Sequence, residues 1–128
     1  MNPLIGLNPP DFTAAESDGR LVGFGRLKPL QPGAVEMTSV FVFPEHRGRG
    51  VGTAIIRSLC ASAGSQDVYL TTIGRRVALY ERFGFVEVPQ CDIPGPLQFE
   101  FRAGTVVAKV AANDRLVVLR RQAGAKAA

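Results

Sequence analysis

The sequence predicts an α/β or α+β domain built around a mixed sheet. Its 128 residues fit one domain, since domains span roughly 100–200 residues. Hydrophobic residues make up 46% of the chain and charged residues 20%, which is enough apolar material for a packed core. Apolar runs and amphipathic stretches follow in the order strands, then strand–helix–strand–helix–strand, and this order predicts the fold class.

The N-terminal part is expected to be rich in strands. Residues 1–10 contain three prolines and predict an irregular lead-in. Strands are expected at 12–16 and 21–27, separated by a turn, and the two glycines of the second strand either weaken it or let another backbone come close. The prolines of 28–33 predict a loop. Residues 35–43 are dominated by β-branched and aromatic residues and form the best strand candidate.

Helices are expected after residue 50 of the chain. Val51, Ile55 and Leu59 recur every four residues, which predicts an amphipathic helix that ends near Gly64. Residues 97–110 alternate like a strand at their start but also fit a helix, and the helix is favoured. The remaining predictions are strands at 68–72, 85–88 and 116–119, a helix at 75–83 capped by Gly84, a connector at 91–96, a turn at 113–114 and a frayed tail at 122–128.

Composition excludes several classes of protein. The sequence contains no run of about 18 apolar residues, so no membrane span is predicted. The first residues also lack the basic region of a signal peptide. Two cysteines, Cys60 and Cys91, and one histidine, His46, are too few for a disulfide scaffold or a common zinc site. The net charge of +4 is a mild excess that could serve a small polyanionic ligand. We therefore expect a cytoplasmic protein with no metal and no membrane partner.

A glycine-rich turn joins the best strand to the first helix, with the sequence Arg47-Gly48-Arg49-Gly50-Val51-Gly52. The first amides of a helix lack internal partners and carry partial positive charge, and glycines let a phosphate approach them. The turn lacks the Gly-Lys-Ser/Thr end of a Walker loop and the Gly-x-Gly-x-x-Gly spacing of a dinucleotide fingerprint. A diphosphate cradle and a plain solvated turn remain the alternatives.

Two segments resemble the GCN5-related N-acetyltransferase (GNAT) superfamily. Residues 40–52 look like its acetyl-CoA signature, Arg/Gln-x-x-Gly-x-Gly/Ala after a strand that ends in proline, and residues 79–85 look like its Leu-Tyr-x-x-x-Gly-Phe segment. The resemblance implies a mostly antiparallel twisted sheet with helices on both faces, the acyl-CoA N-acyltransferase fold. It implies one domain over 1–128, with an acetyl-CoA-binding core at 11–90 and a C-terminal helix and strand at 91–121.

The same resemblance implies acetyl-CoA as co-substrate, with its pyrophosphate on the glycine turn and its pantetheine arm paired with the preceding strand. The strand amide near Val42 would polarise the thioester carbonyl, because a fixed donor favours the developing oxyanion. The implied cofactor-binding residues are Val40, Phe41, Val42, Arg47, Gly48, Arg49, Gly50, Val51, Gly52 and Thr53.

Two residues are candidates for catalysis. Tyr80 matches the family's usual proton donor to the leaving thiolate, and its alternative is a packed tyrosine with a satisfied hydroxyl. Glu36 matches the catalytic glutamate of the histone-acetylating branch, and its alternative is a polar residue at a strand start. Tyr69 is interpreted as packing and His46 as exposed, and neither cysteine has a visible base partner for nucleophilic catalysis.

The chain departs from the family pattern at two places. The family begins with a strand and two helices before its first hairpin, whereas here Phe12 already begins the hairpin, so the acceptor side is open or completed by another chain in a homodimer. Ile73 also stands where many members carry an asparagine that contacts CoA.

The predicted function is transfer of acetyl from acetyl-CoA to a primary amine of a small molecule or protein. A catalytically impaired CoA-binding module is one alternative. A basic nucleic-acid-binding domain using Arg47 and Arg49 is the other, and the lack of interleaved aromatic residues disfavours it.

Overall fold

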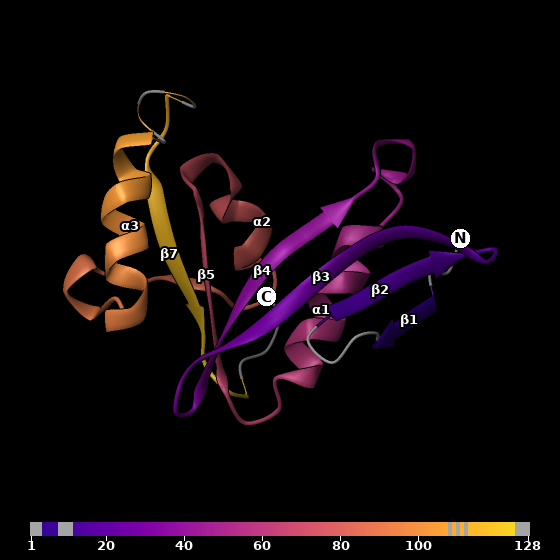
Figure 1. Cartoon of the computed structure of the whole chain (residues 1–128), viewed down its shortest axis with the longest axis horizontal. Helices are drawn as coiled ribbons and strands as arrows, with labels where there is room; N and C mark the ends of the chain where they lie inside the picture. Colours follow the sequence, from indigo (N-terminus) through magenta and orange to yellow (C-terminus); the bar gives the residue numbers. More distant parts are fainter. Residues whose placement is uncertain (1–3, 8–11, 108, 110, 112, 125–128) are drawn as a thin grey trace. The chain divides into compact units, whose positions relative to one another are not determined.

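Figure 1 shows a computed structural model of the chain, which describes residues 4–7, 12–107, 109, 111 and 113–124. The chain divides into two compact units. The N-terminal unit comprises Met1–Pro29 and Val35–Gly64, and the C-terminal unit comprises Leu30–Ala34 and Ser65–Ala128. In chain order the elements are β1 (Leu4–Leu7), β2 (Phe12–Ser17), β3 (Arg20–Gln31), β4 (Ala34–Val42), the 3₁₀ turn η1 (Pro44–His46), α1 (Val51–Ser62), β5 (Asp67–Ile73), η2 (Gly74–Arg76), α2 (Val77–Glu81), β6 (Val86–Glu87), η3 (Gln90–Asp92), α3 (Gly95–Val107) and β7 (Leu116–Arg121).

The N-terminal unit is a sheet with one helix packed on it. Strands β1 to β4 are neighbours in that order, and the β1–β2 and β2–β3 pairs are antiparallel. Helix α1 packs against β2, and its Val51, Ile55 and Leu59 are at most 2% exposed. The four-residue apolar period predicted from the sequence is therefore the buried face of this helix, and the predicted helix is confirmed.

The two glycines of β3 allow α1 to lie unusually close to the sheet. A Cβ atom on Gly25 would stand 2.7 Å from Ile55 Cγ2 and 2.8 Å from Leu59 Cδ1, and one on Gly23 would stand 2.7 Å from the carbonyl oxygen of Phe41. Neither position has room for a side chain without repacking. Of the two interpretations of these glycines, close approach is confirmed.

The opposite face of this sheet carries a cluster of aromatic rings. Because side chains alternate along a strand, Phe24 points away from α1 between the two glycines. Its ring centroid lies 6.3 Å from that of Phe12, 5.7 Å from that of Phe41 and 6.4 Å from that of Phe43. These offset and edge-to-face contacts join three strands on the side that α1 leaves uncovered.

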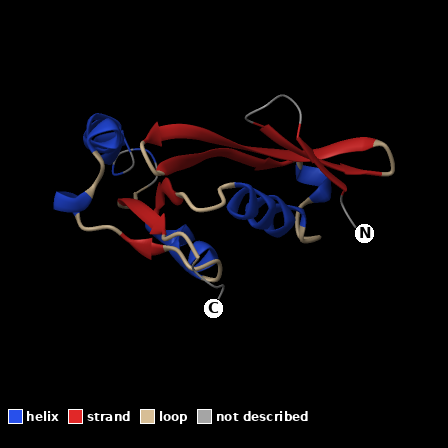
Figure 2. Ribbon diagram, turned by 90° about the horizontal axis from the view of Figure 1, so that it is seen from below, coloured by secondary structure: helices blue, strands red, loops and turns tan. Residues whose placement is uncertain are grey.

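The C-terminal unit is a three-stranded antiparallel sheet with a helix on each side. β7 lies between β5 and β6, and both pairs are antiparallel. Figures 1 and 2 show α3 and α2 on opposite sides of β5 and β7. On the α3 side, Tyr69 and Val118 form a buried cluster with Val88, Ile93 and Leu97. The packing role predicted for Tyr69 is confirmed, and so is an α+β class with a mostly antiparallel sheet.

Two predictions from proline signals are wrong. Residues 28–33 are not a loop, because β3 continues through Pro29 to Gln31 and only residues 32–33 form the turn. Leu30 packs against the buried cluster beneath α3, and this burial favours an extended backbone over a loop. The irregular lead-in predicted for residues 1–10 contains strand β1, whose backbone pairs with β2 from Leu4 opposite Glu16 to Leu7 opposite Thr13.

The remaining elements follow the prediction with shifted ends. The helix expected at 75–83 is a 3₁₀ turn followed by the five residues of α2, and Gly84 follows it with a φ of 91°. The strand expected at 85–88 shortens to β6. The ambiguous stretch after the connector is helix α3, as favoured, beginning two residues earlier than expected. Of the expected tail, residues 125–128 lie outside the described residues, and the backbone N–H of Ala123 donates to Asp67 Oδ1 over 2.9 Å.

Candidate acetyl-CoA site

The glycine-rich turn has a backbone that only glycine adopts readily. Gly48 and Gly50 have φ angles of 78° and 81°, in the left-handed region, and a Cβ atom at either would meet no atom within 4 Å. Gly50 is the residue that caps α1, and its carbonyl accepts the hydrogen bond from the Ala54 N–H over 3.0 Å. The turn is therefore shaped by glycine and open to solvent.

The first turn of α1 lacks the groups that usually satisfy a helix start. No side chain caps it and no acidic residue lies in its first turn, so the amides of Val51, Gly52 and Thr53 have no capping side chain. A Cβ atom on Gly52 would lie 3.6 Å from Val42 Cγ2, an ordinary contact, so the packing of the protein does not require glycine there. This bare backbone and the partial positive charge of the helix end fit an anion such as a diphosphate.

Arg47 fastens the turn to the end of β4. Its Nε donates to the carbonyl oxygen of Val42 over 2.9 Å, and its guanidinium carbon lies 5.4 Å from the centroid of the Phe41 ring. The sequence predicts only that Arg47 adds charge to the cradle. The structure shows that it also fixes the carbonyl of the residue whose amide is the predicted oxyanion donor.

Strand β4 has one residue with left-handed backbone just before the segment where the pantetheine arm is expected to pair. Ser39 has a φ of 57°, which costs a non-glycine residue roughly 1–2 kcal/mol. Val40 and Val42, which follow Ser39, are half-buried, and Phe41 between them is 39% exposed. Nothing in the sequence signals the positive φ, because serine is an ordinary residue within a strand pattern.

Glu36 is a buried carboxylate rather than an exposed polar residue at a strand start. It is the third residue of β4 and only 5% exposed, and its Oε1 lies 3.5 Å from the Nζ atom of Lys28 on β3. A lysine beside a buried carboxylate offsets the cost of removing that charge from water. A buried carboxylate with a charged partner is a candidate functional group, and the catalytic role of Glu36 stays a prediction.

Tyr80 lies on α2 with its ring half-buried. Its ring meets that of Phe85 edge to face, with 5.8 Å between the centroids, and its carbonyl accepts the Phe83 N–H over 2.9 Å. Burial raises the pKa of the Tyr80 hydroxyl, and the nearby charge of Arg76 opposes that shift. The hydroxyl therefore stays protonated at neutral pH, and it makes no hydrogen bond within the part of the chain that the structure describes.

The start of the Tyr80 segment is held by a residue that the sequence analysis did not select. The Oδ2 atom of Asp114 accepts the Arg75 N–H over 3.1 Å and its Nε over 3.2 Å, and Oδ1 accepts the Arg115 N–H over 2.7 Å. These backbone donors lower the pKa of the Asp114 carboxyl. The predicted Asn113-Asp114 turn was the only signal, because no pattern links residues 39 positions apart.

One further prediction about single residues is wrong. His46 is not simply exposed: the η1 turn leaves it half-buried, with a buried Nδ1 that has no hydrogen-bond partner among the described residues. Cys60 is buried in α1 and Cys91 is exposed. The glycine turn and Glu36 belong to the N-terminal unit and Tyr80 to the C-terminal unit, so their convergence on one substrate stays a prediction.

The described residues carry no group of three or more His, Cys, Asp or Glu side chains able to hold a metal ion. None of the described helices is long and apolar enough to span a bilayer.

Several characterised proteins resemble parts of this chain. An L-2,4-diaminobutyric acid acetyltransferase from Nocardia farcinica is 49% identical over 53 residues, which are 40% of this chain and 28% of that protein. A mycothiol acetyltransferase from the same organism is 41% identical over 64 residues, 50% of this chain and 21% of that protein. The N-alpha-acetyltransferase RimI of Mycobacterium tuberculosis is 35% identical over 83 residues, 60% of this chain and 52% of that protein. The chain thus spans about half or less of these relatives.

Solved structures share the fold at low sequence identity. N-acetylglutamate synthase from Neisseria gonorrhoeae, complexed with coenzyme A and N-acetyl-glutamate, superposes with a TM-score of 0.68 at 21% identity, covering 87% of this chain and 25% of that chain. A Mycobacterium tuberculosis protein in complex with CoA gives a TM-score of 0.66 at 24% identity, covering 88% of this chain and 75% of that chain. The sequence model of the acetyltransferase (GNAT) domain matches residues 8–87, more than half of the sequence. The chain therefore belongs to the GNAT acetyltransferase family.

Proposed function

We propose that this protein is an N-acetyltransferase that moves an acetyl group from acetyl-CoA to a primary amine by direct transfer. The observation that carries the proposal is the uncapped start of α1 behind a left-handed glycine turn. This arrangement offers several amide donors and partial positive charge to a diphosphate, and it stands at the position of the family's acetyl-CoA signature. Acetyl-CoA supplies the activated acetyl thioester.

Different residues of the turn would contribute to CoA binding in different ways. The amides from Gly48 to Thr53 would donate to the pyrophosphate oxygens, and Arg49, which is exposed, would add charge. Arg47 would hold the end of β4 in place through its bond to the Val42 carbonyl. The backbone of residues 40–42, which follow the left-handed residue Ser39, would pair with the pantetheine arm.

The chemistry needs a base, an oxyanion donor and an acid. A lysine-type amine has a pKa near 10.4, so it must lose a proton before attack, and Glu36 would accept that proton directly or through water. A nitrogen–carbon bond then forms to the acetyl carbon while the Val42 amide stabilises charge on the carbonyl oxygen. As the carbon–sulfur bond breaks, the Tyr80 hydroxyl would protonate the thiolate. Its raised pKa keeps that proton in place at neutral pH.

The acceptor is proposed only as a class. Relatives of this chain are named as an L-2,4-diaminobutyric acid acetyltransferase, a mycothiol acetyltransferase and an N-alpha-acetyltransferase. We propose that the acceptor is a primary amine of a small molecule or of a protein, and that the protein is cytoplasmic. Its acceptor side is then either open or completed by a second copy of the chain.

A CoA-binding module with impaired turnover is the second candidate. Only residues 8–11 separate β1 from β2, so no pair of helices is inserted there to cover the acceptor side. Strand β1 itself is present, which corrects the expectation that the chain starts directly at the hairpin.

A transfer assay with labelled acetyl-CoA separates the two candidates. Diamines, amino acids and short peptides would be offered as acceptors, and calorimetry would measure CoA binding in parallel. Labelled product that disappears in Tyr80→Phe supports the enzyme. Binding of CoA with no product from any acceptor supports the module, and no binding of CoA at all refutes both.

A further inference from the structure

A pocket lies in the C-terminal unit, on the side of the sheet that α3 covers. Its volume is about 380 Å³, and it is lined by Gln90, Cys91, Ile93, Gln98, Phe101 and Arg102. Gln90 and Cys91 belong to η3, Ile93 follows it directly, and the other three residues belong to α3. Figures 1 and 2 place α2, which carries Tyr80, on the other side of β5 and β7, so the pocket is separate from the Tyr80 hydroxyl.

The apolar residues that line the pocket are held in place by packing. Ile93 is buried in the cluster with Leu97 and Val118, and Phe101 packs against the same cluster. Gln98 is also held, because its Nε2 donates to the carbonyl oxygen of Ile93 over 3.0 Å. That bond leaves the Oε1 atom of Gln98 able to accept a hydrogen bond from a ligand.

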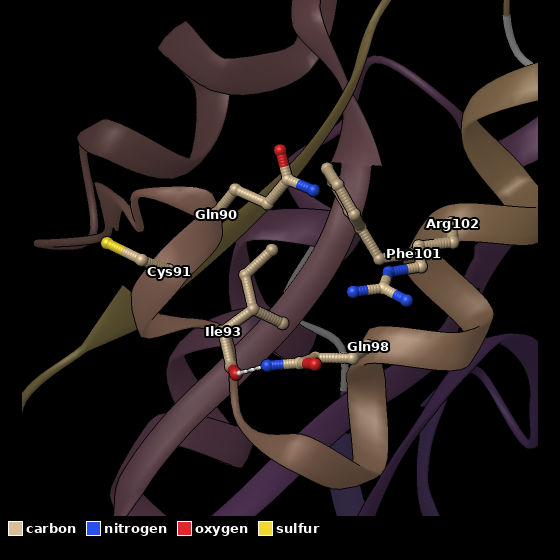
Figure 3. Close-up of a pocket in the computed structure, with 6 residues that line it drawn as sticks. All are labelled: Gln90, Cys91, Ile93, Gln98, Phe101 and Arg102. Carbon is tan, nitrogen blue, oxygen red and sulfur yellow. Dashed lines mark hydrogen bonds between the residues drawn. The ribbon is translucent and has the colours of Figure 1, made fainter.

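The only charge that lines the pocket is positive. Arg102 is the only charged residue among those that line it, and it forms no ion pair with any residue in the described part of the chain. Figure 3 shows its guanidinium turned toward Gln98 and Ile93, the Gln90 amide turned toward Phe101, and the Cys91 sulfur pointing away from the others. The nearest acids in the sequence, Asp92 and Glu100, are exposed and do not line the pocket.

We propose that this pocket binds a small carboxylate that carries an aromatic or branched apolar body. The guanidinium would take the carboxylate through paired N–H donors, the Gln90 amide would add a donor, and the body would lie on Phe101 and Ile93. The volume lies within the range of roughly 300–1,000 Å³ that small-molecule sites occupy. The site is independent of the proposed acetyl transfer, because none of its residues belongs to the glycine turn or to α2.

Titration of the CoA-free, ¹⁵N-labelled full chain with phenylacetate tests the proposal, with neutral phenylacetamide as the probe of equal shape. We expect amide shifts confined to residues 90–102, with a Kd of about 1–10 mM for a ligand of this size. Arg102→Gln should weaken phenylacetate binding about tenfold or more, since the charged donor is lost. Arg57→Gln, which removes an exposed arginine of α1, is the control of equal charge and should change nothing.

Three outcomes would overturn the proposal. Equal binding of phenylacetamide would show that Arg102 does not select a carboxylate. Shifts that are scattered over the chain, or that Arg57→Gln weakens as much as Arg102→Gln does, would show general attraction to a basic protein. No saturable shift in the folded wild-type protein would show that the pocket binds no such ligand. Cys91→Ser should leave binding unchanged, because the sulfur points away from the other five side chains that line the pocket.

Discussion

Gly52→Glu tests the proposed CoA site, because the same substitution should stabilise the fold and weaken the binding of CoA. Gly52 is the second residue of α1, and the space around it accepts a Cβ atom. Removing glycine from a helix favours folding by roughly 0.5–1 kcal/mol, and an acidic residue in an uncapped first turn adds roughly 0.3–1 kcal/mol. The variant should therefore unfold at a temperature equal to or a few degrees above that of the wild type.

The same side chain should prevent CoA from binding. Its carboxylate would occupy the space in front of the first-turn amides and repel a diphosphate. The lost charge-assisted hydrogen bonds are worth roughly 1.5–3 kcal/mol, and repulsion near the surface adds roughly 1–2 kcal/mol. Together they predict a loss of affinity of about a hundredfold or more, measured by isothermal calorimetry with CoA.

A matched control separates this effect from general addition of charge. Gly95 begins α3, and a Cβ atom there would also meet no atom within 4 Å, so Gly95→Glu places the same group at the start of a different helix. That variant should bind CoA like the wild type. If Gly52→Glu keeps wild-type affinity for CoA while remaining folded, the amides of α1 do not hold the pyrophosphate and the proposed site is wrong.

Three further changes have definite expected results. Tyr80→Phe should lower kcat by roughly 10²–10⁴-fold with CoA affinity unchanged, and the alkaline fall of wild-type activity should begin only above the raised pKa of the hydroxyl. Steady-state kinetics across pH would contradict the acid role if the variant kept full activity. Gly25→Val should destabilise the fold by about 1–3 kcal/mol in urea unfolding, because even its Cβ would stand 2.7 Å from Ile55 Cγ2, whereas Gly95→Ala should be nearly neutral. Asp114→Asn should destabilise the protein at neutral pH, since the pKa of this carboxyl is lowered by folding. The difference from wild type in thermal unfolding should start to shrink as pH falls past the ordinary value of 3.8 and should be lost below the lowered pKa, and a difference that does not shrink with falling pH would refute the assignment to charge.

Local chemistry in the sequence determined the glycine-rich turn and the two elements that flank it. The four-residue apolar period predicted α1, the β-branched run predicted β4, and the glycines between them predicted a turn, in which the structure gives Gly48 and Gly50 left-handed backbone. These features depend on backbone sterics and on periodic burial, which act over a few residues and can be read from a single segment.

Tertiary structure decided the features that depend on distant partners. Leu30 joins a buried cluster, so β3 runs through a proline that predicts a loop. Asp114 holds the turn before α2 across 39 residues, and Lys28 meets Glu36 only because β3 and β4 are neighbours. The left-handed backbone of Ser39 could not be predicted from its residue type. Each is set by contacts between segments far apart in the chain, and local propensity carries no information about such contacts.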